Sequence, residues 1–508
     1  MIRSDSLSRL SDSSEQWDIL VIGGGATGLG IAVDAATRGY RTALVERGDF
    51  AEGTSSRSTK LIHGGVRYLR GGEVSLVRES LRERGRLLQN AGGLVQPLPF
   101  VVPAYRWYER FFYGVGLSLY DILAGKLGIH STGHLNTQDA TDKVPNLSQN
   151  GLRGGTLYWD GQFDDARLAI ALARTASESG AALVNHLKVD ELIHEGGKVK
   201  GVLATDQIDG RSFEVRASVV VNATGVFTDS IRKMDDSSST EMMTTSQGIH
   251  IVLDGEFLGG DTAIMIPNTD DGRVLFAIPW HNRVLLGTTD TGGVEIDRHP
   301  VAREDEINYL LKHMARYLQK APERSDVRSI FAGLRPLVRR PGASGSTSKI
   351  SRSHQIVASK SGLLTVAGGK WTTYRQMAEE AVDRAAELGD LGNQSCETHD
   401  LALLNPDVSG DGARLCPELP YSMSDIERGV TQEMAMTLDD VLSRRTRSLL
   451  LDAKATLRVA PEVVRTMSTL LARDDAWAEE ELKRFSKLAE TYIFPTSHRL
   501  SESESEGS

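Results

Sequence analysis

The chain has 508 residues, more than a single hydrophobic core usually holds, so we expect two or three domains. Its formal net charge of -10 argues against nucleic acid as a partner, because Lys and Arg are not in excess to neutralise phosphates. Two cysteines, Cys396 and Cys416, are too few for a disulfide framework, which fits a reducing, cytoplasmic compartment.

Both ends of the chain are polar. Residues 1–16 contain no apolar segment of the length that a signal peptide needs, and we expect a disordered tail there. Residues 499–508 are expected to form a disordered acidic tail. The longest uncharged run, 87–105, contains three prolines and should not cross a bilayer. These features predict a soluble or peripheral protein.

A short apolar run at 17–22 predicts a strand, and a glycine-rich turn with the pattern G-x-G-x-x-G follows it at once. The turn contains Gly23, Gly25, Thr27 and Gly28. An alanine-rich helical pattern covers 29–38, and a second strand, 41–46, ends in Glu46. The glycines let a pyrophosphate approach the first turn of the helix, and the acid can accept ribose hydroxyls. This order of elements predicts dinucleotide binding, and its place at the start of the chain is associated with FAD rather than NAD.

The stretch from Ser55 to Leu69 packs hydroxyls, cations, a histidine and a glycine pair into a few positions, with neither strand nor helix periodicity. The pair Gly64–Gly65 removes side chains where a flat ring could lie against the backbone. The alternative is an ordinary polar loop whose Lys60 and Arg67 are solvated.

The rest of the chain predicts further elements. We expect helices at 165–180, from Thr372 or Thr373 to about 388, and after a cap at 437–440 in a helical segment that begins near 401. We expect strands at 182–189, 217–222, 273–280, 283–290 and 363–367, and a hairpin at 191–205.

Several of these segments together resemble the FAD-dependent glycerol-3-phosphate dehydrogenases, respiratory flavoenzymes of the D-amino-acid-oxidase-like superfamily. The motifs that carry the resemblance are IGGGATGLGIAVDAATRGY, TSSRSTKLIHGGVRYL, YWDGQFDDARL, VVNATGVFTDSI, AIPWHNRVLLGTTDT, FAGLRPLVR, VAGGKWTTYRQMAEEA and EMAMTLDDVLSRRTR. They cover nearly the whole chain except its two tails.

The resemblance implies three domains. They are an α/β FAD-binding domain, Rossmann-like and of the glutathione-reductase type, an α+β substrate-binding domain and a C-terminal α-helical domain. The FAD-binding domain is discontinuous and takes 17–92, 163–232 and 362–388, the substrate-binding domain takes 93–162 and 237–361, and the helical domain takes 401–495.

The resemblance also implies which residues contact FAD, with the loop from Ser55 to Gly65 running beneath the flavin. The implied cofactor residues are Gly23, Gly25, Thr27, Gly28, Glu46, Ser55, Ser56, Lys60, Leu61, His63, Gly64, Val189, Ala223, Gly225, Gly369, Lys370, Trp371 and Thr372.

Oxidation of a secondary alcohol that carries a phosphate needs fixed cations for the phosphate and an acceptor for the hydroxyl proton. The residues assigned to the substrate are Arg67, Tyr68, Arg273, Arg335 and Lys370, of which Arg335 and Lys370 also count as catalytic. His250 is our choice for the base, although Ile249 stands where the family has a small hydroxyl residue. His63 is the competing base. No Cys or His array has metal-ligand spacing, so no metal is expected.

The implied reaction is oxidation of sn-glycerol 3-phosphate to dihydroxyacetone phosphate, with electrons passed from FAD to a membrane quinone in glycerol catabolism. Alternatives are an oxygen-dependent glycerol-3-phosphate oxidase, a related amine oxidase, and a flavin-binding scaffold without turnover. Nothing in the sequence selects between quinone and oxygen.

The segment 105–128 combines aromatic and basic residues and is too short and polar to span a bilayer. This composition suits the headgroup region of a membrane, and the resemblance implies peripheral attachment to the inner face of the cell membrane. The alternatives are that these rings pack in the substrate-binding domain or form the contact of a homodimer.

Overall fold

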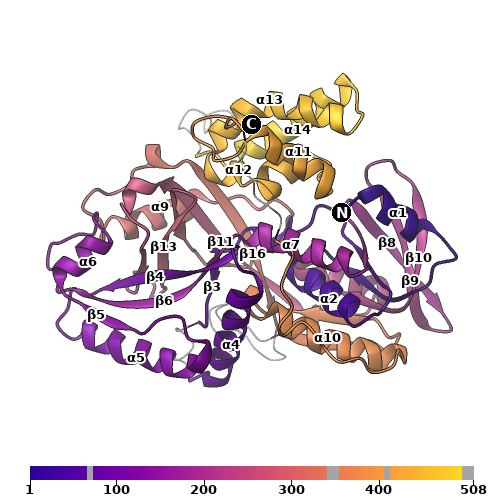
Figure 1. Ribbon diagram of the computed structural model, residues 1–508, viewed down its shortest axis with the longest axis horizontal. Coiled ribbons are helices and arrows are strands. Elements are labelled where there is room, and N and C mark those ends of the chain that lie inside the picture. The colour runs from indigo at the N-terminus through magenta and orange to yellow at the C-terminus, as the bar shows by residue number, and fades with distance from the viewer. Residues whose placement is uncertain (66–71, 340–353, 406–411, 495–508) are drawn as a thin grey trace, which may run out of the picture.

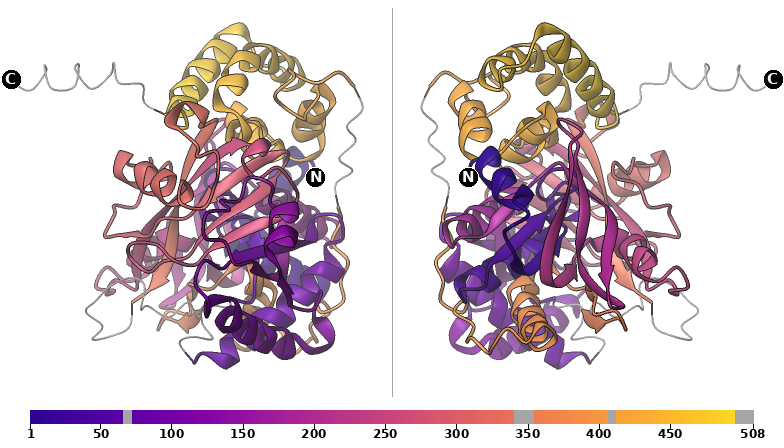
Figure 2. Two further views of the ribbon diagram at one scale, coloured as in Figure 1. Left: turned by 90° about the vertical axis from the view of Figure 1, so that its left-hand side faces the viewer. Right: turned by 90° about the vertical axis from the view of Figure 1, so that its right-hand side faces the viewer.

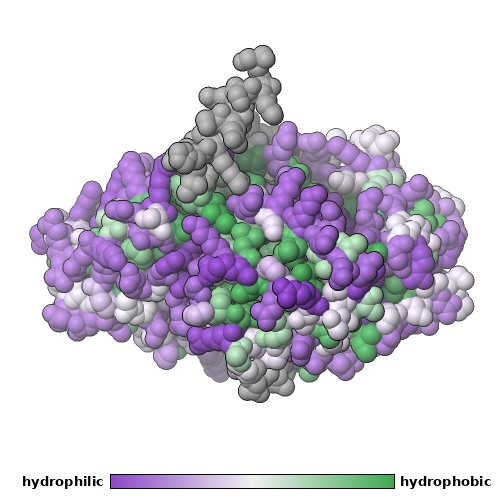
Figure 3. Space-filling view, turned by 90° about the horizontal axis from the view of Figure 1, so that it is seen from above, coloured by the Kyte–Doolittle hydropathy of each residue, from purple (hydrophilic) through white to green (hydrophobic). Residues whose placement is uncertain are grey.

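The computed structural model describes residues 1–65, 72–339, 354–405 and 412–494 (Figure 1). Two β-sheets lie side by side, and the C-terminal helices pack above them (Figures 1 and 2). Seen from that upper side, the surface carries mostly hydrophilic side chains with hydrophobic residues between them (Figure 3).

The first sheet is the predicted dinucleotide-binding sheet. Its strand order is β17-β18-β10-β1-β2-β7, parallel from β18 to β7, and the antiparallel pair β8–β9 extends from β10. The strands are β1 (Trp17–Ile22), β2 (Thr42–Val45), β7 (Ala182–Val184), β8 (Leu187–Glu195), β9 (Lys198–Asp206), β10 (Ser212–Asn222), β17 (Gln355–Ala358) and β18 (Leu364–Ala367). Central β1 is almost wholly buried, because helices or strands cover both of its faces.

Three helices cover one face of this sheet and share a hydrophobic core with it. They are α2 (Ala26–Thr37), α7 (Asp165–Glu178) and α10 (Tyr374–Gly389). Small residues such as Gly30 make this packing close, because a Cβ at Gly30 would lie 2.7 Å from the Tyr374 ring. The expected α/β fold is confirmed.

The second sheet has the order β15-β11-β14-β13-β12-β4-β6-β3, with β16 paired to β11 and β5 paired to β6. Its strands are β3 (Leu61–Ile62), β4 (Val95–Pro103), β5 (Gly133–Leu135), β6 (Gly155–Phe163), β11 (Met243–Asp254), β12 (Ala263–Ile266), β13 (Leu275–Trp280), β14 (Arg283–Gly287), β15 (Thr291–Gly292) and β16 (Ser329–Val338). The helices around the two sheets are α4 (Val74–Asn90), α5 (Glu109–Ala124), α6 (Thr137–Lys143), α8 (Thr228–Asp235) and α9 (Glu304–Met314).

The expected C-terminal helical domain is confirmed, and its core is continuous with that of the second sheet. Its helices are α11 (Met423–Gln432), a π-helix (Asp440–Arg445), α12 (Ser448–Leu451), α13 (Ala453–Leu470) and α14 (Asp475–Glu490). Buried residues of α12 and α13 share one hydrophobic cluster with Trp280 and Phe331 of the second sheet. The expected helical segment after a cap at 437–440 is confirmed, with Thr437 Oγ1 accepting the N–H of Asp440, and it is divided into three helices by breaks at Thr446 and Asp452.

Two further expectations need correction. The disordered tail expected at 1–16 is wrong over α1 (Arg3–Ser11), where Leu7 and Leu10 are buried and Arg3 pairs with Asp206 at 2.9 Å. The boundary between 361 and 362 is also wrong, because β17 pairs with β18 as the edge strand of the first sheet. The expected acidic tail at 499–508 lies outside the described residues.

Candidate active site

A cavity with a volume of about 410 Å³ is lined from both sheets. The first sheet contributes Ile22, Val45 and Val366, and the second contributes His250 of β11 and residues 333–337 of β16. The predicted cofactor residues that line this cavity are Gly23, Gly25, Thr27, Glu46, Ser55, Leu61, His63, Val189, Ala223, Gly225, Gly369, Lys370, Trp371 and Thr372. The fold therefore brings together residues that are spread over most of the chain.

The glycine-rich turn forms one end of this cavity, where β1 gives way to the first turn of α2. Gly23 has a φ of 112°, which an L side chain rarely adopts, and a Cβ there would lie 2.6 Å from the carbonyl oxygen of Ala223. Gly25, Ala26 and Thr27 line the cavity at the start of the helix. Backbone and helix dipole there favour an anion such as a pyrophosphate.

Glu46 is held at the edge of this turn by the backbone. Its two carboxylate oxygens accept N–H groups from Gly24 at 2.6 Å and from Gly48 at 2.8 Å. Burial raises the pKa of Glu46, while these two donors oppose the shift. Each oxygen keeps a lone pair, so Glu46 can still accept the ribose hydroxyls that the sequence assigned to it.

The polar loop is tied to the other parts of the dinucleotide site. Ser55 Oγ accepts the N–H of Ala26 at 2.9 Å, and Trp371 Nε1 donates to the Ser55 carbonyl at 2.9 Å. Thr372 Oγ1 donates to the carbonyl of His63 at 3.3 Å. These bonds join three pieces of the cofactor site, and the residues that they link lie 29 to 316 positions apart in the sequence.

Lys60 and Ser56 do not line the cavity, which corrects two predicted cofactor contacts. Lys60 is fully buried, and its Nζ donates to Asp165 at 2.7 Å and to the Ser56 carbonyl at 2.8 Å. Burial lowers the pKa of Lys60 to about 8, although Asp165 opposes the shift. The ammonium is turned away from the cavity because this buried carboxylate binds it.

Three further predicted residues also lie off the cavity wall. Gly28 packs against the carbonyl of Gly23, so it shapes the turn without facing the cavity. The N–H of Gly64 donates to Tyr120 Oη at 2.6 Å. Arg273, assigned to the substrate, instead pairs with Asp271 at 2.8 Å. The predicted residues Arg67 and Tyr68 lie outside the described residues.

His250 lies on β11 with its ring stacked on Phe331, at 4.9 Å between ring centroids. The ring is buried, lines the cavity, and places Nε2 3.0 Å from Thr59 Oγ1. Burial first, and then the charges of Lys60 and Arg335, hold the pKa of His250 well below its ordinary 6.5. The imidazole is therefore neutral at physiological pH and can accept a proton.

Arg335 lies on β16, the strand next to His250. Its Nη2 donates to the carbonyl of Thr289 at 2.8 Å, and its Nη1 lies 3.3 Å from Asp290 Oδ1. These contacts fix the guanidinium at the cavity wall, where it can offer its fork to an anion. Lys370 lines the same cavity and donates to Ser80 Oγ of α4 at 3.3 Å.

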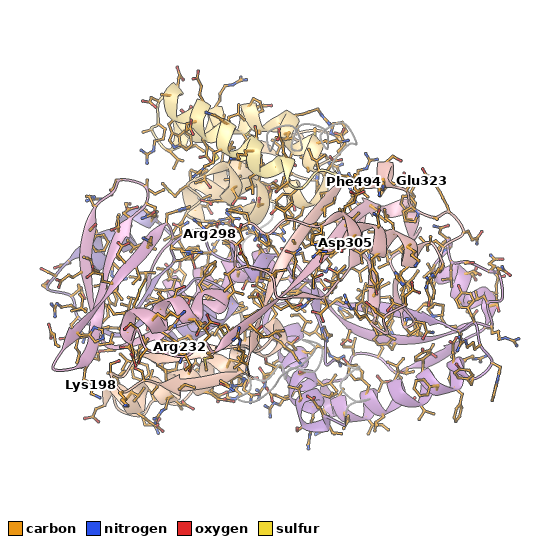
Figure 4. The ribbon with its side chains drawn as sticks, turned by 180° about the vertical axis from the view of Figure 1, so that it is seen from behind. Lys198, Arg232, Arg298, Asp305, Glu323 and Phe494 are labelled. Carbon is orange, nitrogen blue, oxygen red and sulfur yellow. The ribbon has the colours of Figure 1, made fainter. Side chains whose placement is uncertain are left out.

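Sequence reasoning missed several polar residues of the cavity wall, among them Arg57, Thr59, Thr288 and Arg298. Arg298 lies in the middle of the molecule below the C-terminal helices (Figure 4) and pairs with Glu52 at 2.7 Å. Thr59 stands between Ser58 and Lys60 in the polar loop, so the density of hydroxyls there was a usable signal. Arg298 carries no local signal, because only the tertiary fold brings it to the cavity.

Two groups of three side chains among the described residues have metal-capable atoms close together. They are Glu379, Cys396 and His399, and the buried set Asp49, His186 and Asp440. In the buried set the carboxylates already bind Arg444 and Arg445 at 2.6 to 2.9 Å. Guanidinium groups therefore occupy the oxygens that a metal ion would need.

Comparison with known proteins agrees with this site. The family described as FAD dependent oxidoreductase matches residues 18–375, and the C-terminal domain of alpha-glycerophosphate oxidase matches residues 365–478. The chain is 40% identical to the mitochondrial glycerol-3-phosphate dehydrogenase of Rattus norvegicus, covering 95% of this chain and 74% of that protein. It is 36% identical to the mitochondrial enzyme of Arabidopsis thaliana, covering 94% and 87%.

Among solved structures, the glycerol-3-phosphate dehydrogenase of Bacillus halodurans complexed with FAD superposes with a TM-score of 0.78 at 28% identity, covering 97% of this chain and 98% of that chain. The residues of this chain fit the same cofactor, because Gly23, Gly25 and Thr27 line the cavity at the start of α2, where backbone N–H groups favour a pyrophosphate, with Glu46 at its edge for the ribose. The chain belongs to the family of FAD-dependent glycerol-3-phosphate dehydrogenases.

Proposed function

We propose that the protein oxidises sn-glycerol 3-phosphate to dihydroxyacetone phosphate. The observation that carries this proposal is that His250, Arg335 and Lys370 line the same cavity as the dinucleotide turn. The relatives named as glycerol-3-phosphate dehydrogenases support the choice of substrate. When bound, FAD supplies the acceptor for the hydride that leaves the secondary carbon of the substrate.

In this proposal the two cations hold the phosphate. Arg335 suits two phosphate oxygens because its planar fork donates along parallel directions, whereas Lys370 offers a single ammonium. Arg67 and Tyr68 stay predicted substrate residues. Fixing the phosphate holds the reacting carbon at one place in the cavity, which is the main contribution that binding makes to the rate.

His250 accepts the hydroxyl proton in this proposal. Its neutral ring has the protonation state of a base, and a phosphate dianion beside Arg335 would offset one of the charges that lower the pKa of His250. His63 lines the same cavity and stays the alternative base. We favour His250 because it lies beside Arg335, whereas the backbone of His63 is held next to the predicted cofactor residue Thr372.

The test is anaerobic reduction of the bound flavin. The flavin absorbance should bleach with sn-glycerol 3-phosphate but not with glycerol, because glycerol lacks the phosphate that the cations bind. Bleaching by neutral amino acids would instead favour an amine oxidase. A bound flavin that no polyol phosphate reduces would favour a scaffold without turnover.

We also propose that a membrane quinone accepts the electrons and that the protein docks peripherally on the cytoplasmic face of the membrane. One face of α5 supports this, because its large apolar residues are exposed: Phe111 by 74%, Phe112 by 57% and Ile122 by 74%, with Trp107 just before the helix exposed by 81%. Exposed Arg106 and Arg110 lie beside them. None of the helices in the described ranges is long and apolar enough to cross a membrane.

The alternative that the rings of this segment belong to the protein core applies to Tyr120, which is fully buried, and in part to Tyr105 and Tyr113, which pack against hydrophobic clusters. A homodimer contact through the same exposed face remains a prediction, and sedimentation of the detergent-free protein would test it. Hydrogen peroxide measured during turnover, with and without a soluble quinone, would distinguish oxygen from quinone as acceptor.

A further inference from the structure

One buried carboxylate anchors the polar loop from behind. Asp165, the first residue of α7, is fully buried. Its Oδ2 accepts the N–H of Ser58 at 3.0 Å and the hydroxyl of Ser58 at 2.7 Å, and Lys60 Nζ donates to the same oxygen at 2.7 Å. Both neighbours of Thr59 are therefore fixed by a single oxygen atom.

An arginine of the C-terminal segment completes this anchor. Arg447 is fully buried, and its Nη2 lies 3.0 Å from Asp165 Oδ1 and 2.9 Å from the Ser56 carbonyl oxygen. Lys60 donates to that same carbonyl. We call Ser56, Lys60, Asp165 and Arg447 the rear cluster. Its parts lie up to 391 residues apart in the sequence.

The charges of the rear cluster are balanced only together with the neighbouring Asp164. The cluster holds the cations of Lys60 and Arg447 against Asp165, and Asp164 Oδ1 lies 3.5 Å from Arg447 Nε. The cations also lie against aromatic rings, with Lys60 Nζ 5.1 Å from the Phe331 centroid and Arg447 Cζ 5.6 Å from the Trp280 centroid. Because these groups are out of water, loss of one member leaves its partners as uncompensated buried charges.

The other side of the same turn faces the cavity. Thr59 lines the cavity, and its hydroxyl lies 3.0 Å from His250 Nε2. His250 Nδ1 is buried with no hydrogen-bond partner among the described residues. The Thr59 hydroxyl is therefore the polar contact that orients this imidazole, and the stack on Phe331 fixes the plane of the ring.

We propose that the rear cluster positions Thr59 against His250. Arg447 of the C-terminal segment then helps to orient the imidazole of His250, in addition to its structural role of joining two parts of the fold. Thr59, Asp165 and Arg447 are positioning residues in this proposal, and His250 acts on the substrate. The proposal rests on the proposed function in that it takes His250 as the base.

The experiment compares four single variants as holoenzymes. Thr59→Val removes the hydroxyl at nearly constant volume, and Thr59→Ser retains it. Arg447→Met breaks the rear cluster. Arg445→Met is the matched control, because Arg445 is equally buried in the same segment but binds Asp49 at 2.6 and 2.8 Å, away from the loop.

We expect Thr59→Val and Arg447→Met each to lower kcat about 10- to 100-fold and to change KM less than about threefold. Both changes displace the His250 ring and leave the cations that bind the phosphate in place. Thr59→Ser should stay near the wild type. Arg445→Met should lower the melting temperature about as much as Arg447→Met but keep kcat. Adding Arg447→Met to Thr59→Val should lower kcat little further, because both changes disable one contact.

A second measurement needs no substrate. In holoenzyme labelled with ¹⁵N-histidine, the signals of His250 are identified by their loss in His250→Gln, and they report the tautomer and protonation of the ring. Thr59→Val and Arg447→Met should shift these signals in the same direction, whereas Arg445→Met should leave them in place.

Unshifted His250 signals in Arg447→Met, or full kcat in that variant with only a lower melting temperature, would overturn the proposal. So would independent, multiplying losses of kcat in the double variant. If the wild-type flavin is not reduced by glycerol 3-phosphate, the proposed function fails. The ¹⁵N signals still decide whether the rear cluster positions His250.

Discussion

Replacing Arg335 by Leu tests where the substrate phosphate binds. Arg335 is fixed at the cavity wall by the carbonyl of Thr289, at 2.8 Å, and lies 3.3 Å from Asp290 Oδ1. Leucine fills similar space but provides no donor and no charge. Since the phosphate would lose a charged partner in the Michaelis complex, we expect KM for glycerol 3-phosphate to rise.

The size of the effect follows from the contacts. A hydrogen bond to a charged group contributes about 1.5–3 kcal/mol, which corresponds to about a 10- to 150-fold change in an equilibrium constant. In Arg335→Leu the carboxylate of Asp290 also loses its cation and then repels the phosphate, which moves the expectation to the upper half of that range. Adding Asp290→Asn removes this repulsion, so the double variant should recover part of the lost affinity.

The assay is steady-state turnover with a soluble dye as acceptor, combined with anaerobic flavin reduction to show that the flavin is intact. Arg339→Leu is the control, because Arg339 lies four residues further on, is exposed and pairs with Glu241 at 3.3 Å. A KM for Arg335→Leu within twofold of the wild type would show that the phosphate binds elsewhere. A loss confined to kcat would assign Arg335 to the chemical step.

Three further predictions concern the base, the cofactor and the membrane. The pKa of His250 is lower in the folded protein than its ordinary 6.5, so on acidification the unfolded chain binds a proton at this residue before the folded protein does. His250 therefore makes the free energy of unfolding decrease as the pH falls below 6.5. His250→Gln should reduce that decrease in chemical denaturation series at several pH values, and should lower kcat. Gly28→Val should abolish flavin retention on purification while the chain remains expressed, because any Cβ there overlaps the Gly23 carbonyl and opens the turn; a full flavin content would contradict the assigned turn. The double variant Phe111→Ser, Phe112→Ser should shift the protein from sedimented lipid vesicles to the supernatant without changing dye-linked turnover. Val301→Ser is the control, because it also replaces an exposed apolar residue, and it should leave vesicle binding unchanged. Unchanged vesicle binding of the double variant would exclude α5 as the anchor.

The dinucleotide half of the site was readable from the sequence because its signals are local. An apolar strand, a glycine turn and an Ala-rich helix stand next to one another, and each requires only its neighbours to form. The same holds for the hairpin around Gly196–Gly197, observed as β8 and β9. The resemblance also indicated Arg335 and His250, and the fold places both on adjacent strands, β16 and β11, with Phe331 opposite His250.

What failed depends on contacts between distant segments. Lys60 was assigned to the cofactor by its place in a polar loop, but Asp165, 105 residues later, binds its ammonium behind the cavity. The first residues are polar enough to read as a disordered tail, yet α1 forms because Leu7 and Leu10 find an apolar surface on the first sheet. Such outcomes are set by tertiary burial, which overrides local propensity.

The C-terminal arginines show most clearly why fold and site cannot be separated here. Arg444, Arg445 and Arg447 are all buried, and each binds a carboxylate of the dinucleotide-binding half, Asp49 or Asp165. Buried ion pairs contribute little net stability compared with apolar packing, but removing one partner is strongly destabilising. Asp165 begins α7 and binds Ser58 and Lys60 of the polar loop, whereas Asp49 lies just beyond β2 and binds Asn185. The carboxylate that holds the polar loop from behind, Asp165, therefore depends on a cation from the last quarter of the chain, Arg447.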